Sequence, residues 1–363
     1  MAELLKDMFS PAYLRALADD IHAVYPAFRA DDFIQDTMDE TWQTLELKGR
    51  MRQITLNLGK YLPQQYSEAL GVIDRVIQTQ GNWREGFAMF FPDFIEVYGQ
   101  AEADLELSIA ALARYTPYAS SEFAVRPFII KHEARMMAQM LAWAGDENED
   151  IRRLASEGCR PALPWAVALV KYKQDPSPIL PILEALKDDP ALYVRKSVAN
   201  NLNDISKTHP ALVVQIAKRW YGTSERTDWI VKHACRTLLK RGNPEALAIF
   251  GYHDSSAVDV HTFALGEAAV EIGGALSFSF VVQAKAATKV RLEYGIDFVK
   301  ANGKQSRKIF QISELEMGAG QEKTYQKTHA FADLSTRKHY VGLHAITLIV
   351  NGTERGTLEF DVR

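Results

Sequence analysis

Apolar residues recur at helical spacing through roughly the first 250 residues. Leu14, Leu17, Ile21 and Val24 fall three or four positions apart near the start. Comparable runs follow between residues 45 and 77, 101 and 115, and 120 and 143. Side chains at this spacing share one face of an α-helix. This part of the chain is therefore predicted to be a series of amphipathic helices that pack through their apolar faces.

A period of two replaces the helical period after about residue 258. Leu276, Phe278, Phe280 and Val282 alternate with polar or smaller residues, and similar alternation returns at 290–298, 340–350 and 358–362. Asn351-Gly352 predicts a tight turn between the last two strands, with a loop as far as Gly356 as the alternative. About seven short strands predict an immunoglobulin-like β-sandwich.

The chain is thus predicted to be multidomain, α followed by β. The expected domains are a helical domain at residues 1–252 and a β-sandwich domain at 258–363. The polar stretch Tyr252-His253-Asp254-Ser255-Ser256 is interpreted as the linker between them.

The helical part contains a weak internal repeat. Ile151, Val194 and Val231 each open a similar segment, at intervals of 43 and 37 residues. A period near 40 residues with two helices per unit is typical of HEAT-like repeats, which stack into an α-solenoid.

Paired basic residues occupy equivalent positions of the three repeats. Arg152-Arg153 aligns with Arg195-Lys196 and Lys232-His233. Stacked repeats would place these pairs along one face, where they suit a phosphate backbone. The alternative is a solvated helical face, which is the usual explanation of a run of charges.

One segment combines charges with an abrupt helix end. Arg153, Glu157 and Arg160 fall at i, i+4 and i+7, so they share one stripe of a helix. Pro161 and Pro164 then prevent the helix from continuing, and Trp165 follows. One interpretation is a functional corner with a carboxylate between two guanidinium groups. The other is a surface ion-pair ladder beside a core tryptophan.

Charge is unevenly distributed. The net charge of the chain is −4, but residues 131–245 carry 18 Lys and Arg against 14 Asp and Glu. Residues 1–130 carry 11 against 19. The locally cationic middle suits an anionic partner, although the total charge alone would argue against nucleic acid.

Cysteine and histidine usage indicates no metal site. The two cysteines, Cys159 and Cys235, fit no disulfide or metal-binding spacing, so a reducing cytoplasm is expected. A hydrolase site made of His233 and Cys235 is disfavoured, because residues two apart on a helix point to different sides. The sequence also shows no membrane span and no signal peptide.

Three segments resemble a known family in their order and spacing. They are Glu122-Phe-Ala-Val-Arg-Pro-Phe128, Arg152 to Trp165, and Val194-Arg-Lys-Ser-Val-Ala-Asn-Asn-Leu-Asn-Asp204. They resemble the AlkC group of bacterial DNA alkylation-repair glycosylases, which is related to AlkD and built on HEAT-like repeats. The likeness covers roughly residues 1–250. The trailing sandwich is similar to the form of AlkC that carries an immunoglobulin-like module.

The resemblance implies an activity and a partner. A monomeric, cytoplasmic bacterial protein that associates with the nucleoid when on DNA would excise cationic methylated bases from double-stranded DNA. The implied substrates are chiefly 3-methyladenine, with 3-methylcytosine and 1-methyladenine as further ones. The lesion would not be flipped into a deep pocket, unlike in most glycosylases. No metal or organic cofactor is expected.

The same resemblance, combined with glycosidic chemistry, suggests roles for individual residues. Cleavage passes through an oxocarbenium-like sugar, which a carboxylate can stabilise. Glu157 is the first candidate and Glu122 the second, while Trp165 would offer an aromatic face to developing positive charge. The DNA-binding candidates are Arg152, Arg153, Arg160, Arg195, Lys196, Asn200, Asn201, Asp204, Lys232, His233 and Arg236.

Bland alternatives remain open at this point. Asp204 would equally pair with Lys207, and Asn201 would equally cap or space helices. A helical-repeat scaffold that binds DNA or protein without catalysis would share the fold, since a fold alone does not determine function.

Overall fold

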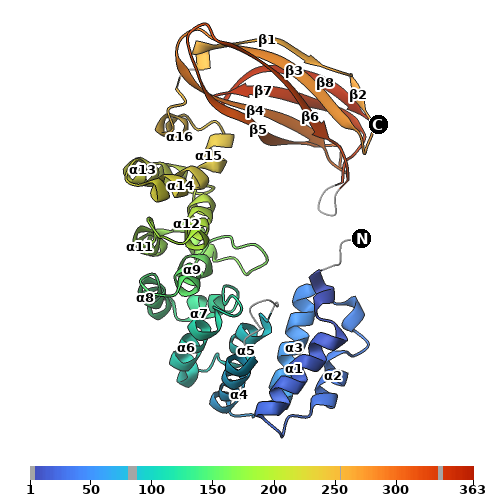
Figure 1. Ribbon diagram of the computed structural model, residues 1–363, viewed down its shortest axis with the longest axis vertical. Coiled ribbons are helices and arrows are strands. Elements are labelled where there is room, and N and C mark those ends of the chain that lie inside the picture. Colours follow the sequence, from blue (N-terminus) through green and yellow to red (C-terminus); the bar gives the residue numbers. More distant parts are fainter. Residues whose placement is uncertain (1–4, 81–87, 254, 334–337) are drawn as a thin grey trace. The chain divides into compact units, whose positions relative to one another are not determined.

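The computed structural model describes residues 5–80, 88–253, 255–333 and 338–363, in which helices are followed by strands (Figure 1). The α-helices are Pro11–Val24 (α1), Ala30–Thr37 (α2), Leu47–Tyr61 (α3), Tyr66–Gln80 (α4), Phe90–Tyr98 (α5), Leu105–Tyr115 (α6), Val125–Lys131 (α7), Glu133–Trp143 (α8), Glu149–Gly158 (α9), Val170–Gln174 (α10), Leu180–Ala185 (α11), Leu192–Ile205 (α12), Pro210–Trp220 (α13), Glu225–Ala234 (α14), Arg236–Lys240 (α15) and Pro244–Ile249 (α16). The predicted fold class, helical repeats followed by an immunoglobulin-like β-sandwich, is confirmed. In the described residues, no helix combines the length and apolarity needed to cross a lipid bilayer.

The chain divides into two compact units. The first contains the residues up to Thr208 together with Ser224–Ala234, and the second contains His209–Thr223 together with Cys235–Arg363. Helices α13, α15 and α16 therefore belong to the same unit as the strands. This division by packing differs from the division by secondary structure, in which the last helix ends at Ile249 and the first strand begins at Val258.

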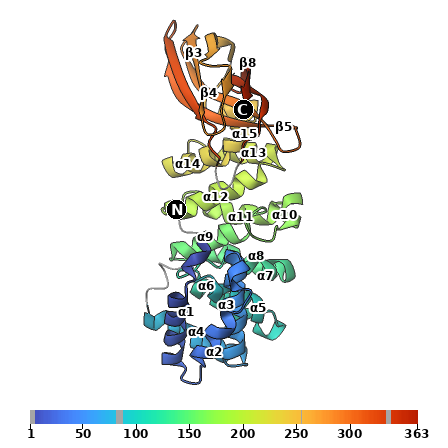
Figure 2. The ribbon, with the colours of Figure 1, turned by 90° about the vertical axis from the view of Figure 1, so that its right-hand side faces the viewer.

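Within the first unit, helices stack in successive layers. Helix α9 lies beside α8, α11 contacts both α8 and α9, and α9, α12 and α14 follow one another in a row (Figures 1 and 2). The repeat anchors Val194 and Val231 are 0% and 1% exposed, so they face the packing between layers. The predicted repeat helices correspond to α9, α12 and α14. Ile151 and Val194 are each the third residue of their helix, whereas Val231 is the seventh residue of α14, so the predicted alignment holds for the first two repeats.

The second unit holds two sheets around one core. The strands are Val258–Leu265 (β1), Ala269–Val270 (β2), Ala275–Ala284 (β3), Thr288–Val299 (β4), Gln305–Met317 (β5), Glu322–Ala330 (β6), Gly342–Val350 (β7) and Thr353–Val362 (β8). One sheet has the order β1-β3-β6 and the other β2-β8-β7-β4-β5. The alternating residues Leu276, Phe278, Phe280 and Val282 of β3 are all buried between the sheets, as their period of two predicts.

The turn between β7 and β8 has two residues. Asn351 and Gly352 both have positive φ, 46° and 77°, as a type I′ hairpin turn requires. Pairing begins at once with Val350 opposite Thr353, so the alternative of a loop as far as Gly356 is wrong. The Asn351 side chain is buried and accepts a hydrogen bond from the Arg291 backbone N–H at 2.7 Å, so this asparagine serves the turn.

The predicted linker is packed at its first residue. Tyr252 is 4% exposed, and the Lys289 ammonium lies 6.0 Å from the centre of its ring. Before it, Gly242 (φ 65°) lies so close to the hairpin that an added β-carbon would stand 2.8 Å from the Gly352 carbonyl oxygen. Helices α15 and α16 are therefore fastened to the sandwich by their loops, because only glycine fits this approach.

Candidate functional site

A chain of buried charges runs along α9 and into the loop that follows it. The Arg160 guanidinium donates to Glu157 Oε1 at 2.7 Å, and the Arg153 guanidinium lies 3.5 Å from the same oxygen. Ser197 Oγ of α12 donates to Glu157 Oε2 at 2.6 Å. Glu157 and Arg160 are only 5% and 7% exposed. The alternative of a surface ion-pair ladder is therefore wrong: these charges are buried between two repeat helices.

The buried charges support one another electrostatically. Burial lowers the pKa of Arg153, but Glu122 and Glu157 raise it more, so that its pKa lies above the ordinary value. Burial likewise lowers the pKa of Arg160, and Glu157 and Asp204 outweigh that effect. Both guanidinium groups stay charged, because each has a carboxylate on two sides.

Glu122 reaches the same cluster from outside any helix. The sequence suggested a helix beginning at Ser120 or Ser121, but α7 begins only at Val125. Ser120 Oγ instead accepts from the Glu122 backbone N–H, which stabilises a turn. This turn leaves the Glu122 side chain free to pair with Arg153, and Ser120 Oγ lies 3.0 Å from Glu122 Oε2.

The two carboxylates differ in what remains available. Both oxygens of Glu157 accept bonds from within the protein. Within the described residues, the interactions of Glu122 all use Oε2, so its Oε1 is left for water or a ligand. The Glu122 side chain is also the more exposed, 15% against 6%. Sequence reasoning ranked Glu157 first, and this geometry favours Glu122 as the group that meets a substrate.

The other end of the charge cluster lies on α12. Asp204 accepts from Arg160 Nε at 2.9 Å and from Lys207 Nζ at 2.9 Å. Asp204 is 5% exposed, so its first effect is to hold Arg160 toward Glu157. Asn201 is fully buried and donates to the Ser156 carbonyl oxygen at 2.8 Å. Asn201 therefore joins α12 to α9, in line with the helix-spacing alternative, and offers no exposed atom to DNA.

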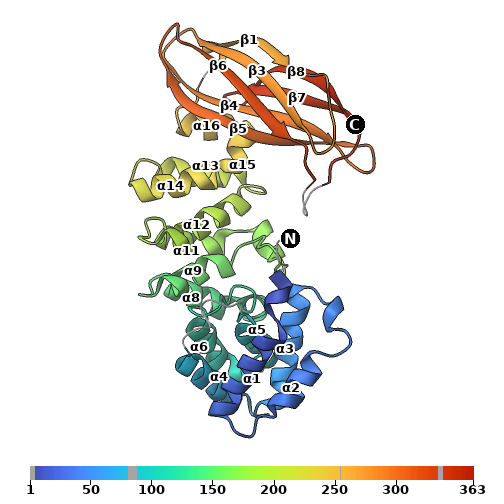
Figure 3. The same cartoon turned by 45° about the vertical axis from the view of Figure 1, so that its right-hand side comes forward.

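Trp165 is the opposite of a core tryptophan. Its side chain is 68% exposed, although it is a large aromatic residue. Its φ is +64°, a left-handed conformation that costs a bulky residue on the order of 1–3 kcal/mol. Strained residues of this kind are retained where function needs a particular geometry. The loop between α9 and α10, which carries this exposed indole, projects from the helices (Figure 3).

A small cavity lies between Glu122 and Trp165. Its volume is about 120 Å³. Its lining comes from five separate parts of the chain and consists of Phe9, Leu47, Lys48, Met51, Met89, Glu122, Phe123 and Trp165. The Lys48 ammonium donates to the Trp165 carbonyl oxygen at 2.8 Å and lies 4.8 Å from the centre of the Phe123 ring. The cavity is thus largely apolar, with one carboxylate and one ammonium group at its wall.

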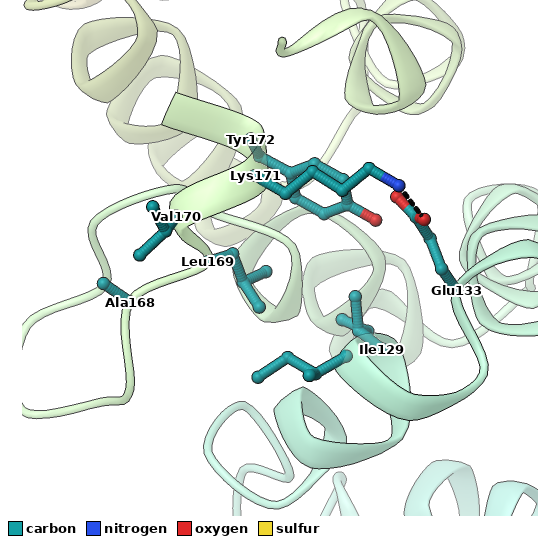
Figure 4. A pocket seen from close by; sticks show the side chains of 8 residues that line it. Ile129, Glu133, Ala168, Leu169, Val170, Lys171 and Tyr172 are labelled. Carbon is teal, nitrogen blue, oxygen red and sulfur yellow. Dashed lines mark hydrogen bonds and ion pairs between the residues drawn. The ribbon is translucent and has the colours of Figure 1, made fainter. Parts of the chain in front are cut away.

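A second cavity, of about 300 Å³, lies at the far end of the same loop (Figure 4). Residues Ala168 to Tyr172 form one wall, and Ile129, Ile130 and Glu133 form the other. Lys171 pairs with Glu133 across it. Tyr172 is 2% exposed, so the start of α10 is firmly anchored. The loop that carries Trp165 therefore runs between two fixed helix ends.

The first basic residue of the pair has backbone partners in the first two repeats. Arg152 Nη1 donates to the carbonyl oxygens of Asp146 and Glu147, and Arg195 Nη1 does the same to Asp189 and Pro190. Both arginines thus hold the loop that leads into their own helix, at the same spacing. This shared role supports the alignment of the first two repeats, and Arg152 and Arg195 are less free to bind phosphate than expected.

The second basic residue of each pair varies more. Lys196 is exposed and, within the described residues, takes part in no ion pair, so it is available to a phosphate. His233 is exposed and stacks on Trp229 with ring centres 3.8 Å apart, while Arg195 lies 5.9 Å from the Trp229 ring. Lys232 is exposed on the same helix, and Asn200 is half-buried on α12. Arg236 opens α15 and belongs to the second unit.

Four residues of this region escaped sequence reasoning. Ser197 supports Glu157, and Tyr193 is 43% exposed with the Arg153 guanidinium 4.9 Å from its ring centre. Lys48 comes from 117 positions away, so no local pattern could have linked it to Trp165. Arg126 lies inside the Glu122–Phe128 segment, and nothing in the sequence indicated that it is buried.

Comparison with known proteins explains this arrangement. The family model described as DNA alkylation repair enzyme matches residues 119–238, and that of the C-terminal Ig-like domain of YhaZ matches residues 259–363. The chain is 46% identical over 358 residues to the protein YhaZ of Bacillus subtilis (strain 168), covering 99% of each. The solved structure of the Pseudomonas fluorescens alkylpurine DNA glycosylase AlkC, bound to DNA containing an abasic site analogue, superposes with a TM-score of 0.94. That match has 36% identity and covers 99% of this chain and 100% of the other.

The chain belongs to the AlkC family. The resemblance inferred from sequence is therefore confirmed, including the C-terminal immunoglobulin-like domain. The matched repair-enzyme region contains every AlkC-type candidate residue from Glu122 to Arg236. Lys48 lies outside it, although the structure brings Lys48 to the Trp165 loop.

Proposed function

We propose that this chain is a DNA glycosylase of alkylation repair, which hydrolyses the bond between deoxyribose and a base made cationic by methylation. Its AlkC-family membership supports the reaction class. The observation that carries the proposal is the pairing of a partly exposed carboxylate, Glu122, with a strained and exposed indole, Trp165, at one small cavity. The substrates proposed are 3-methyladenine first, then 3-methylcytosine and 1-methyladenine, in double-stranded DNA.

The chemistry needs little beyond charge and position. Methylation at a ring nitrogen makes the base a good leaving group, so the glycosidic bond breaks with its electron pair going to the base. The sugar becomes oxocarbenium-like, water adds to C1′, and a proton is released. A carboxylate near the sugar stabilises the positive charge and orients the water. In this proposal Glu122 does both through Oε1.

Glu157 then has a supporting role. Arg153 and Arg160 hold it, and Arg153 also holds Glu122, so the two carboxylates share one guanidinium. Glu157 thereby keeps Arg153 in place and adds negative potential behind Glu122. Trp165 contributes an aromatic face to the cationic base or sugar, where cation–π attraction favours the transition state.

The size of the cavity argues against extrusion of the base. Pockets that enclose a small molecule are typically about 300–1,000 Å³, and the cavity between Glu122 and Trp165 is about 120 Å³. We therefore propose that the lesion is attacked while it stays in the duplex. The exposed Lys196 and Lys232, with His233, would contact phosphates of the DNA. The protein is proposed to act as a monomer in the bacterial cytoplasm.

The test is excision from a duplex that carries one N3-methyladenine. Wild type and Glu122→Gln would be compared for release of free base in single turnover and for DNA binding. Release by wild type, with loss in the variant while binding is retained, supports the proposal. No release by wild type from any of the three cationic lesions would leave a non-catalytic scaffold that binds DNA or protein.

A further inference from the structure

Arg126 is a buried cation that the chemistry above does not use. It lies on α7 and is 1% exposed. Within the described residues it forms no ion pair with a carboxylate, and its Nη2 has no hydrogen-bond partner. Burying a guanidinium without a carboxylate partner costs free energy of folding, so a role other than ion pairing is expected for Arg126. Burial lowers its pKa to about 10, which leaves it charged at neutral pH.

The two hydrogen bonds of Arg126 meet both ends of the Trp165 loop. Nη1 donates to the Gly158 carbonyl oxygen at 2.9 Å, directly after Glu157. Nε donates to the Val167 carbonyl oxygen at 2.6 Å, two residues after Trp165. A single rigid guanidinium thus fixes the end of α9 relative to the last residues of the loop before α10. It also satisfies a carbonyl group at the helix C-terminus, where a positive charge is favoured.

Lys48 holds the loop at its outer side. Its ammonium donates to the Trp165 carbonyl oxygen itself, at 2.8 Å. Lys48 is exposed on α3, so its removal leaves no cavity and no buried unpaired group. Two cations from separate helices therefore bind backbone carbonyl groups of this loop. Arg126 of α7 binds carbonyls before and after Trp165, and Lys48 of α3 binds that of Trp165 itself.

We propose that Arg126 and Lys48 are positioning residues that hold Trp165 in its left-handed conformation and at a fixed distance from the carboxylate pair. This inference rests on the proposed function for its effect on excision, but not for its effect on Trp165. Without the two cations the loop relaxes, because a left-handed tryptophan is unfavourable on its own. Arg126 is buried and the Lys48 ammonium is bonded to the Trp165 carbonyl oxygen, so neither is assigned a contact with the reacting atoms. Their effect on the reaction passes through the placement of the indole.

The experiment uses the full chain labelled with 5-fluorotryptophan. The six tryptophans give separate ¹⁹F signals, and Trp165→Phe identifies the signal of Trp165. Arg126→Lys keeps the charge but replaces the two-pronged guanidinium by one ammonium group, and Lys48→Met removes the outer contact. In both variants the Trp165 signal is expected to move toward its unfolded-chain position and to narrow, because motion of the loop averages its surroundings.

Two matched controls come from the same unit. Arg50→Lys changes another buried arginine that donates to a carbonyl oxygen, that of Lys6, and whose other partners, Asp7 and Trp42, also lie outside the loop. Lys60→Met changes another exposed lysine of α3, which pairs with Asp36. Neither control should move the Trp165 signal. Lys48→Arg, which retains a donor at that position, should restore the wild-type signal.

Excision supplies the second measurement. The single-turnover rate constant should fall on the order of tenfold to a hundredfold in Arg126→Lys, since small displacements of a positioned group have effects of that size. DNA affinity should stay within about threefold, because no proposed phosphate contact is lost. An unchanged Trp165 signal in both variants would overturn the proposal. If Arg126→Lys fails to fold, Lys48→Met decides alone; if wild type excises nothing, the ¹⁹F signals still decide.

Discussion

Each compact unit contains a buried cluster in which one arginine lies between two glutamates. The two clusters differ in the residues that surround them. In the first unit, Arg153 lies between Glu122 and Glu157. In the second, Arg291 of β4 lies between Glu293, at 2.6 Å, and Glu314. Arg291 and Glu293 are 3% and 1% exposed, so the sandwich cluster is at least as well buried as the one on α9.

The difference lies in the surroundings. The backbone N–H of Arg291 donates to the Asn351 side chain of the hairpin turn, and its guanidinium pairs with the two glutamates of neighbouring strand positions. The cluster on α9 ends instead on Glu122, at the wall of a cavity shared with an exposed tryptophan of positive φ. A buried ion cluster is thus a poor indicator of function by itself. An open carboxylate next to a strained aromatic residue is a much better one.

The largest expected effect concerns stability and should be alike in the two clusters. Glu157→Leu and Glu293→Leu each leave a buried arginine short of a carboxylate. Each should lower the free energy of unfolding of its own unit by about 3–5 kcal/mol. Urea unfolding followed separately for each unit, with Trp165 for the first and Tyr294 for the second, measures this. A loss below about 1 kcal/mol at either site would show that the charges there are not coupled.

The second effect should separate the two clusters. Glu122→Gln should lower the single-turnover excision rate constant by about 10²–10³-fold, the typical result of losing one electrostatic stabiliser of a transition state. Glu314→Gln, the corresponding change beside Arg291, should leave the rate constant within about twofold, because Glu314 is not part of the proposed site although its side chain is as exposed as that of Glu122, 16% against 15%. Equal losses in the two variants would contradict the assignment of the reaction to the cluster on α9.

The third effect compares the residues with positive φ. Trp165→Gly removes strain from an exposed position and should not destabilise the protein, while excision falls roughly tenfold through the lost cation–π contact. Asn351→Gly also suits its φ, but it removes two buried side-chain hydrogen bonds. That change should cost about 1–3 kcal/mol with normal excision. Thermal unfolding together with the excision assay tests both outcomes at once.

The smallest effect concerns single surface lysines. Lys196→Met should weaken DNA binding and reduce the slope of log K against log salt by about 0.9 if Lys196 neutralises one phosphate. Lys171→Met serves as control, since Lys171 already pairs with Glu133. Fluorescence titrations at several salt concentrations suffice. A salt slope that Lys196→Met leaves unchanged would remove Lys196 from the proposed DNA contacts.

Much of the fold could be predicted because each element carries its own period. Alternation in β3 and the Asn351-Gly352 turn determined strands and register locally, and Val194 and Val231 marked repeat helices. The site was harder. The spacing of Arg153, Glu157 and Arg160 identified the charge cluster but not its burial, because burial depends on Ser197 and on the packing of α12 against α9.

The remaining misses share a physical cause. Lys48 and Arg126 donate to backbone carbonyl groups, which every residue possesses. Their partners therefore cannot be predicted from the pattern of side chains. Trp165 was ambiguous for a related reason. A tryptophan after Pro164 is compatible with a core or a surface position until the conformation of the loop is known. In the structure it is exposed and has a positive φ.

The close approach of Gly242 to Gly352 has consequences for truncation of the chain, for proteolysis and for folding during synthesis. During synthesis, α15 and α16 leave the ribosome before the β7–β8 hairpin has been made. They can therefore complete their packing only after the last hairpin has been synthesised. A chain truncated near residue 255 would leave Leu247 and Tyr252, both buried in the intact protein, facing water. Protease trimming of the native protein should accordingly spare the segment from 242 to 252, and β7–β8 would be as necessary to the last two helices as to the sandwich.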